Sequence, residues 1–291
     1  MVGLLRVLVL LWFLLSTCDA HGYLLVPPQR SSFWRERTGL PINYEDNQLN
    51  CGGYSTQWDL NGGKCGVCGD PYWGPWENQP PFGKYATGTI SRCYKRGTTH
   101  IDLKMILTSN HLGTIQLRLC PHNDVSVPVT QDCLNTHLLQ LENKNGLSLG
   151  TTYRVVKFEQ VIELRVRLPL DIQCSQCVLQ WTYAAGNNWG CDGPLCGMGH
   201  GSQEHFVNCA DIAILNDCAA FYTTTTTAPT VTEKFSPTTW SPMSAVSIIP
   251  KDWVNCIAAN EWLGQPKVDK WCRINCPMGY CPRTHCFCPD I

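Results

Sequence analysis

The chain has 291 residues, a formal net charge of −1 and 19 cysteines. A charge this close to zero, with no long basic run, argues against a nucleic-acid partner. Beyond residue 20, no stretch of the sequence is apolar enough to span a bilayer. We therefore expect neither a nucleic acid nor a membrane among the partners of this protein.

Residues 1–20 have the pattern of a secretory signal peptide. One basic residue, Arg6, lies in an apolar run, and a stretch of small residues ends at Ala20. Cleavage there would leave a secreted, extracellular protein that begins with His21. A terminal histidine carries a free α-amine beside its imidazole, so it can give two nitrogen ligands to a metal at neutral pH. The alternative is that cleavage precedes a histidine by chance.

The cysteines divide the rest of the chain into two modules. Twelve lie between Cys51 and Cys218 and six between Cys256 and Cys288, and even numbers are typical of separately bridged secreted modules. Residues 222–250 contain no cysteine and are rich in Thr, Ser and Pro, which is typical of an O-glycosylated linker. The predicted organisation is a signal peptide (1–20), a first domain (21–221), this linker (222–250) and a disulfide-rich C-terminal module (251–291).

Alternating apolar residues predict strands on both sides of a short loop at residues 108–114. The apolar positions are Ile101, Leu103, Met105 and Leu107 before the loop, and Ile115, Leu117 and Leu119 after it. The loop contains Asn and Gly, which favour turns. Residues 100–120 therefore predict a β-hairpin with His111 at its tip.

Short strands continue along the first domain. They are expected at residues 153–158, 161–168, 178–183 and 207–214. This spacing predicts an all-β domain, an antiparallel β-sandwich of the immunoglobulin or fibronectin type. Residues 51–85 and 186–204 show no periodicity and are predicted to be long loops tied by disulfides. Two C-x-x-C pairs, Cys65/Cys68 and Cys174/Cys177, are interpreted as structural disulfides because the module is secreted.

His111 and His21 could together form a metal site. A loop between strands can project His111 beyond the end of the sheets, where the chain terminus also lies in a sandwich. Two imidazoles and one amine would supply three nitrogens and leave an open position, which suits Cu(II). Zinc is the competing metal. Spacing alone does not select His111 from the eight histidines of the chain.

Four segments resemble lytic polysaccharide monooxygenases, most closely the animal-rich auxiliary activity family 15. The segments are His21-Gly22-Tyr23, Thr108-Ser109-Asn110-His111-Leu112-Gly113, Ala185-Gly186-Asn187-Asn188-Trp189-Gly190 and Gln203-Glu204-His205-Phe206-Val207-Asn208-Cys209-Ala210-Asp211-Ile212. The resemblance covers nearly all of residues 21–218. It implies a histidine brace that holds one copper ion, with amine and imidazole from His21 and the third nitrogen from His111.

The resemblance also assigns the surroundings of the copper, with two departures from the family pattern. Phe206 would close the axial side as a residue that cannot coordinate, where many relatives have tyrosine. Ser109 stands where relatives often have alanine. Either Gln203 or Glu204 would be the polar group that positions bound oxygen.

The implied activity is oxidative cleavage of chitin, with cellulose as the alternative substrate, by a secreted monomer. Copper would use an external electron donor and O₂ or H₂O₂ to take hydrogen from a sugar C–H, and the hydroxylated sugar would then eliminate across the glycosidic bond. The alternatives are a non-catalytic chitin-binding matrix protein and a disulfide-rich binding module in which His21 is incidental.

Aromatic residues are the candidates for contact with the polysaccharide. In the first domain these are Tyr23, Trp34, Tyr54 and Trp58, and for each the alternative is packing against the loops. The C-terminal module resembles small cysteine-rich modules appended to invertebrate chitin-active enzymes. Its aromatic rings could anchor the enzyme to the polymer, or Trp262 and Trp271 could form its minimal core.

Overall fold

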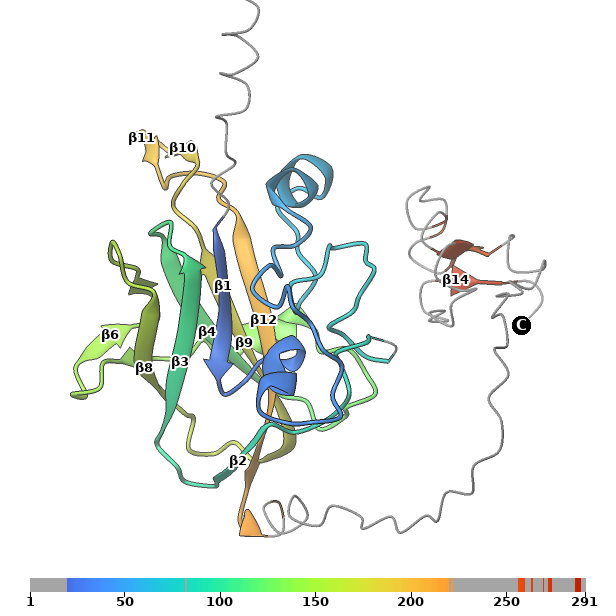
Figure 1. Ribbon diagram of the computed structural model, residues 1–291, viewed down its shortest axis with the longest axis vertical. Helices are drawn as coiled ribbons and strands as arrows, with labels where there is room; N and C mark the ends of the chain where they lie inside the picture. Colours follow the sequence, from blue (N-terminus) through green and yellow to red (C-terminus); the bar gives the residue numbers. More distant parts are fainter. Residues whose placement is uncertain are drawn as a thin grey trace, which may run out of the picture.

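Two five-stranded sheets pack face to face in the computed structural model, which describes residues 20–81, 83–219 and 221 and, near the C-terminus, 256–259, 263, 269, 272–273 and 286–288 (Figure 1). The first sheet has the order β1 (His21–Val26), β3 (His100–Ser109), β8 (Val161–Arg167), β5 (Leu141–Glu142) and β6 (Ser148–Gly150). The second has the order β2 (Arg92–Lys95), β12 (His205–Leu215), β9 (Cys174–Ala184), β4 (Thr114–Pro121) and β7 (Tyr153–Arg154).

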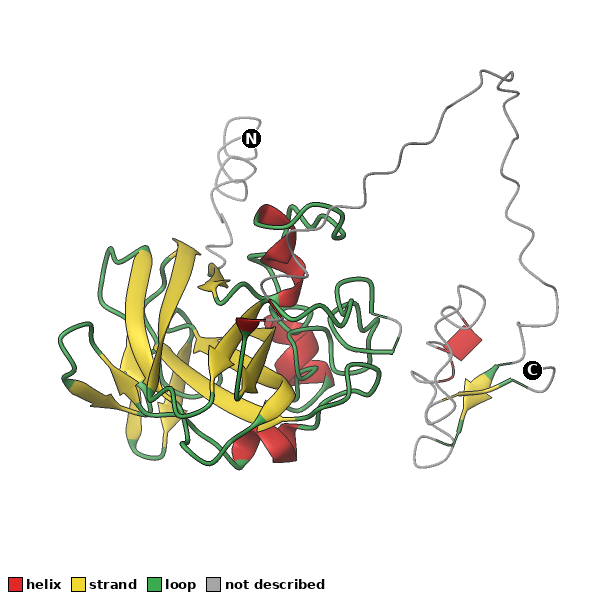
Figure 2. Cartoon of the chain, turned by 90° about the horizontal axis from the view of Figure 1, so that it is seen from below, coloured by secondary structure: helices red, strands yellow, loops and turns green. Residues whose placement is uncertain are grey.

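The remaining elements are short. They are η1 (Arg30–Arg35), η2 (Thr56–Leu60), α2 (Gln131–Asn135), the hairpin β10 (Trp189–Asp192) with β11 (Leu195–Met198), and the pair β13 (Ile257–Ala258) with β14 (Cys286–Phe287). Figure 2 shows that strands dominate the first domain and that its helical turns lie in the connecting segments. Among the described residues, no helix is long and apolar enough to cross a membrane.

The core forms because apolar residues alternate along the strands and face the opposite sheet. The predicted apolar residues of β3 and β4 are all at most 3% exposed, and Trp181, Tyr183 and Phe206 are the largest fully buried side chains. All strand pairs are antiparallel except β12 with β2. The prediction of an all-β antiparallel sandwich is confirmed.

The predicted hairpin over residues 100–120 is wrong. β3 pairs with β1 and β8 in the first sheet, whereas β4 pairs with β7 and β9 in the second. Residues 110–113 therefore carry the chain from one sheet to the other. Both strands bury one face, so their alternating pattern suits a hairpin and a crossing equally. His111 still lies at the tip of the connection.

Two other strand predictions need correction. The strand expected at residues 153–158 stops at Arg154 (β7), and a turn occupies the residues before β8. The segment 186–204, predicted to be a loop, contains the hairpin formed by β10 and β11. Its glycines and cysteines obscure the period-2 pattern because they carry little apolar side-chain signal.

All twelve cysteines of the first domain are paired. The disulfides are Cys51–Cys65, Cys68–Cys209, Cys93–Cys218, Cys120–Cys133, Cys174–Cys177 and Cys191–Cys196. The C-x-x-C cysteines are thus structural, although only Cys174 and Cys177 bond to each other. In the described part of the C-terminal module, the pairs Cys256–Cys288 and Cys272–Cys286 form. The predicted signal peptide before Ala20, the linker 222–250, Trp262 and Trp271 lie outside the described residues.

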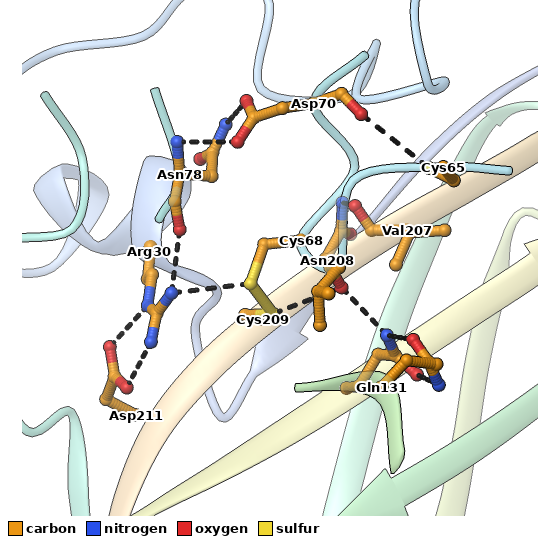
Figure 3. Close-up of a disulfide and its surroundings, with 12 residues drawn as sticks. Arg30, Cys65, Cys68, Asp70, Asn78, Gln131, Val207, Asn208, Cys209 and Asp211 are labelled. Atoms are coloured by element: carbon orange, nitrogen blue, oxygen red, sulfur yellow. Dashed lines mark hydrogen bonds and ion pairs between the residues drawn. A yellow bond between two sulfur atoms is a disulfide. The ribbon is translucent and has the colours of Figure 1, made fainter. Parts of the chain in front are cut away.

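A buried ion pair joins the loops to β12 beside the Cys68–Cys209 disulfide (Figure 3). Arg30 donates to both oxygens of Asp211 at 2.6 and 2.8 Å, and both side chains are at most 5% exposed. A third Arg30 nitrogen donates to the carbonyl of Asn78 at 2.7 Å. Asn78 in turn donates to both oxygens of Asp70 at 2.8 and 2.9 Å. One guanidinium therefore holds two distant loop segments against the second sheet.

Replacing Arg30 by methionine should destabilise the fold by about 3–5 kcal/mol, because it leaves the buried Asp211 carboxylate without its cation. Denaturant unfolding with intact disulfides measures this loss. The matched control is Arg92→Met, which removes the 2.6 Å ion pair of Arg92 with Glu36. The Arg92 side chain is 29% exposed and the Glu36 side chain is 34% exposed. This control should cost less than about 1 kcal/mol. If the two variants lost the same free energy of unfolding, the buried ion pair would not contribute more to stability than the exposed one.

Candidate metal centre

His21 lies at the first position of β1, directly opposite Ser109 at the end of β3. The neighbouring Gly22 is buried against β3, where a Cβ atom would lie 2.6 Å from the side chain of Leu107. The Gly22 amide donates to the carbonyl of Asn47 at 3.0 Å, outside the regular ladder. A glycine is therefore needed for the close approach that brings the start of β1 against the end of β3.

His111 is held through its backbone on both sides. Its amide donates to the Tyr183 hydroxyl at 3.1 Å, and its carbonyl accepts from the Gly186 amide at 2.9 Å. Asn110 caps the loop by accepting from the Leu112 amide at 2.8 Å, as in an Asx-turn. These contacts fix the direction in which the loop leaves β3.

Ser109 links the positions of His21 and His111. The hydroxyl of Ser109 lies 2.9 Å from Nε2 of His111, and Ser109 is the residue that faces His21 across the two strands. Figure 1 shows that β1 begins at the end of the sandwich where the chain crosses from β3 to β4. Both histidines are partly exposed there.

Aromatic rings form the inner wall of this site. Phe206 is fully buried, and its ring centroid lies 6.1 Å from that of His21. The Phe206 ring stacks on Tyr183 at 5.9 Å, and Tyr183 packs at 6.0 Å on Trp181. Burial, with a further effect of the Glu204 charge, raises the pKa of Tyr183 to about 12. The phenol that accepts from His111 therefore stays protonated at neutral pH.

Gln203 and Glu204 have different surroundings. The Gln203 amide exchanges two 3.0 Å hydrogen bonds with the Asn188 backbone and donates to the His200 carbonyl at 2.6 Å. Both ends of this side chain are thus used to fasten the segment after β9. Of the two candidates for the polar group near bound oxygen, Gln203 is therefore the one whose N–H groups both donate to backbone carbonyls.

Glu204 is buried and 6% exposed. Its Oε1 accepts from the side-chain amide of Asn50 at 2.9 Å, and its charge contributes to the raised pKa of Tyr183. It is therefore the candidate whose carboxylate lies near Tyr183, the residue that holds the His111 backbone.

The other described histidines have partners elsewhere or lie away from His21. His100, at the opposite end of β3, lies 3.0 Å from Glu142, and His200 lies 2.9 Å from Asp192. His205 contacts Gln57 at 2.8 Å, and burial lowers the pKa of its imidazole. His122 contacts the Val127 carbonyl at 2.8 Å, and the His137 carbonyl accepts from Leu119. His285 lies outside the described residues.

The four aromatic residues predicted to contact substrate are differently placed. Arg35 lies over the rings of Tyr23 and Trp34, 5.4 and 4.7 Å from their centroids, and both rings are partly covered. Tyr54 is 36% exposed. Trp58 packs inward: its indole donates to the Gln203 carbonyl at 2.7 Å, and its ring lies edge-on to His205.

Sequence reasoning missed Tyr183 and Asn50, which hold His111 and Glu204. Tyr183 belongs to the apolar face of β9 and has the same spacing signal as its core neighbours, so nothing in the pattern marks its hydroxyl. Asn50 lies in a segment without periodicity. Contacts between segments so far apart in the chain leave no trace in local patterns.

The donor chemistry fits copper. Among the described residues, no group of three or more His, Cys, Asp or Glu side chains is placed to hold a metal ion. Cleavage after Ala20 would convert the His21 amide into an amine, which would add a third nitrogen to the two imidazoles. The disulfides leave no thiolate among the twelve cysteines of this domain. A set made only of nitrogen suits Cu(II).

Comparison with known proteins identifies the family of this chain. Residues 21–212 match the model of the family of lytic polysaccharide mono-oxygenases described as cellulose-degrading. A lytic polysaccharide monooxygenase AA15 from Thermobia domestica, solved in the Cu(I) state, is 41% identical, with a TM-score of 0.62. That alignment covers 68% of this chain and 100% of the other. A polysaccharide monooxygenase CBM33 is 13% identical, covers 67% of this chain and 99% of its own, and has a TM-score of 0.38.

No curated protein sequence matches the chain. The family match nevertheless begins at His21 and spans most of the chain, and the Thermobia domestica enzyme aligns over its whole length. The predicted resemblance is confirmed for the first domain, whereas the resemblance of the C-terminal module stays a prediction. The chain belongs to the lytic polysaccharide monooxygenases of the AA15 type, which are copper-dependent enzymes.

Proposed function

We propose that the mature chain binds one copper ion in a histidine brace made of the His21 amine and imidazole and the His111 imidazole. The observation that carries this proposal is the position of Ser109, which faces His21 across β1 and β3 and lies 2.9 Å from Nε2 of His111. His21 begins β1, and His111 lies in a short connection whose backbone is hydrogen-bonded to Tyr183 and Gly186, which favours a fixed ligand geometry.

When bound, copper supplies one-electron chemistry with O₂ or H₂O₂, which the side chains of this protein cannot perform. The chain's own residues hold the ion and shape its surroundings. Phe206 presents an apolar ring and excludes water from the inner side of the site. We propose Glu204, which accepts a hydrogen bond from Asn50, as the polar group that positions the oxygen co-substrate. The Gln203 amide instead donates to backbone carbonyls of the segment after β9.

We propose export of the protein and chitin as its substrate. Six disulfides within one domain of the described chain require an oxidising compartment, which supports secretion. The resemblance of the C-terminal module to modules of chitin-active enzymes favours chitin. Cellulose, which the description of the matching family names, is the alternative polymer. We further propose that the enzyme acts as a monomer with an external electron donor.

The mature chain should bind one Cu(II), with an electron paramagnetic resonance spectrum of an axial, nitrogen-rich site. His111→Ala should weaken binding by roughly 100-fold or more, since only one residue would then remain as ligand. His100→Ala and His137→Ala are the controls and should bind copper as the wild type does. Isothermal titration calorimetry measures the Cu(II) affinity of the wild type and of the three variants. Loss of copper in His100→Ala with retention in His111→Ala would refute the assignment of His111.

Incubation of the copper-loaded enzyme with chitin, a reductant and O₂ or H₂O₂ should release oxidised oligosaccharides, detected by mass spectrometry. The reason is that the partly exposed brace can reach the surface of a polymer that no enclosed cleft would admit. A parallel reaction on cellulose tests the alternative substrate, and omission of the reductant is the control. Products without oxidation, or no products on either polymer, would favour a non-catalytic chitin-binding protein.

A further inference from the structure

A polar groove lies on the outer face of the second sheet, which is turned away from the core. Its floor is formed by alternate residues of β4, β9 and β12, because the residues between them point into the core. The groove has a volume of about 430 Å³, which is in the range of small-ligand sites. On β4 and β9, the floor residues that lie opposite one another are Thr114 and Ala184, Gln116 and Thr182, and Arg118 and Gln180.

Disulfides hold the wall of the groove beside β12. Residues 63–66 line this wall. Cys65 is bonded to Cys51, and Cys68, just after the wall, is bonded to Cys209 of β12. The wall therefore has its position before a ligand arrives, so that binding costs little conformational entropy.

Two segments meet over Gln180 at the Arg118 end of the groove. Gln180 is buried, and its side-chain amide donates to the Val67 carbonyl at 2.7 Å and to Oε1 of Gln131 on α2 at 2.9 Å. Gln131 donates back to Oε1 of Gln180 at 3.2 Å. The polar atoms of Gln180 therefore have partners within the protein, and Arg118 is the charged group beside it.

Arg118 is a half-buried arginine without a carboxylate partner among the described residues. Its guanidinium donates to Oε1 of Gln116 at 2.9 Å, and burial lowers the pKa of Arg118. The other described arginines of the partly buried class each form an ion pair with a carboxylate. These pairs are Arg30–Asp211, Arg92–Glu36 and Arg165–Asp102. Removing a guanidinium from water costs free energy, and at Arg118 no anion of the described chain offsets that cost.

The groove is positively charged. Among the described residues, no aspartate or glutamate lines it, and the second cation on its walls is Lys64. The Lys64 ammonium lies 5.2 Å from the ring centroid of Tyr72, which also lines the groove. His205 adds no charge at neutral pH, because burial lowers the pKa of its imidazole. An anion is therefore the kind of ligand that the groove favours.

We propose that this groove, here called the Arg118 groove, binds a small saccharide that carries a carboxylate. The Arg118 guanidinium holds the carboxylate through two parallel hydrogen bonds, an arrangement that lysine cannot make. The hydroxyls of Thr114 and Thr182 offer donors and acceptors to the sugar hydroxyls, and the Tyr72 ring offers an apolar face to its C–H groups.

Two sources can supply such a ligand. One is a uronic acid within a glycan, and the other is the aldonic acid at the end of an oxidised oligosaccharide. Only the second source rests on the proposed function. The groove lies along the side of the sandwich, whereas His21 and His111 lie where β1 begins and β3 ends, so the two sites can be tested separately.

The test uses the full-length mature chain after incubation with equimolar Cu(II). Calorimetric titration measures the affinity for four probes: a glucuronate-containing disaccharide, diacetylchitobionic acid, neutral diacetylchitobiose and inorganic sulfate. Arg118→Gln removes the charge, and Arg118→Lys keeps the charge without the planar fork. The matched control is Arg96→Gln, which removes an exposed arginine that donates to Gln173 outside the groove.

At least one of the two carboxylated disaccharides should bind the wild type roughly 10-fold or more tightly than the neutral disaccharide does, because its hydrogen bonds to arginine are charge-assisted. Arg118→Gln should remove this difference, and Arg118→Lys should retain part of it. Arg96→Gln should bind all probes as the wild type does. The thermal unfolding temperature of Arg118→Gln should not fall, since Arg118 has no carboxylate partner to lose.

Tighter binding of the glucuronate probe would assign the groove to uronic-acid glycans, and tighter binding of the aldonate would assign it to oxidised products. The proposal is overturned if the neutral disaccharide or sulfate binds as tightly as both acids, or if neither acid binds. Undiminished acid binding by Arg118→Gln, with a changed Cu(II) spectrum, would place the acid at the metal and also overturn it. If the glucuronate probe binds through Arg118 but the chain oxidises no polysaccharide, the groove stands and the proposed function fails.

Discussion

The crossing of the chain between the two sheets at residues 110–113 is the constraint on which the site depends. Gly113 has a φ of +88° and lies so close to the end of β9 that a Cβ atom would be 2.0 Å from the Ala184 carbonyl oxygen. Only glycine allows this turn. The turn places His111 at the end of β3, where β1 begins with His21. A hairpin at the same place would keep both strands in one sheet and would move His111 away from the second sheet, which supplies Tyr183 and Phe206.

The second sheet and its loops hold this arrangement in place. The Leu24 amide of β1 donates to the side chain of Asn208 on β12 at 3.1 Å, so the strand that carries His21 is tied to the opposite sheet. β12 in turn is joined to the loops by the Cys68–Cys209 disulfide and by the ion pair of Arg30 with Asp211. The sheets therefore position His21 and His111, and the disulfide-tied loops pack around the second sheet.

Much of the fold was predictable because its strands bury one face. The alternation in β3, β4 and β8 gave their positions to within a residue or two, and the even cysteine count agrees with complete pairing in the first domain. Which strands pair was not predictable, since alternation specifies a buried face and not a neighbour. Local patterns marked His21 through its place after Ala20. They could not select His111, or distinguish Glu204 from Gln203, because those choices depend on contacts with Ser109, Asn50 and Asn188 that form only in the folded chain.

The central claim, that the His21 amine is a copper ligand, is tested most directly by inserting one alanine between Ala20 and His21 in the exported protein. The amine then becomes an amide, which is a poor ligand unless it loses its proton. We predict that, without copper, the thermal unfolding temperature equals that of the copper-free processed enzyme, and that calorimetric titration shows Cu(II) affinity lowered by at least about 100-fold. Copper binding as tight as that of the processed enzyme would contradict the histidine brace.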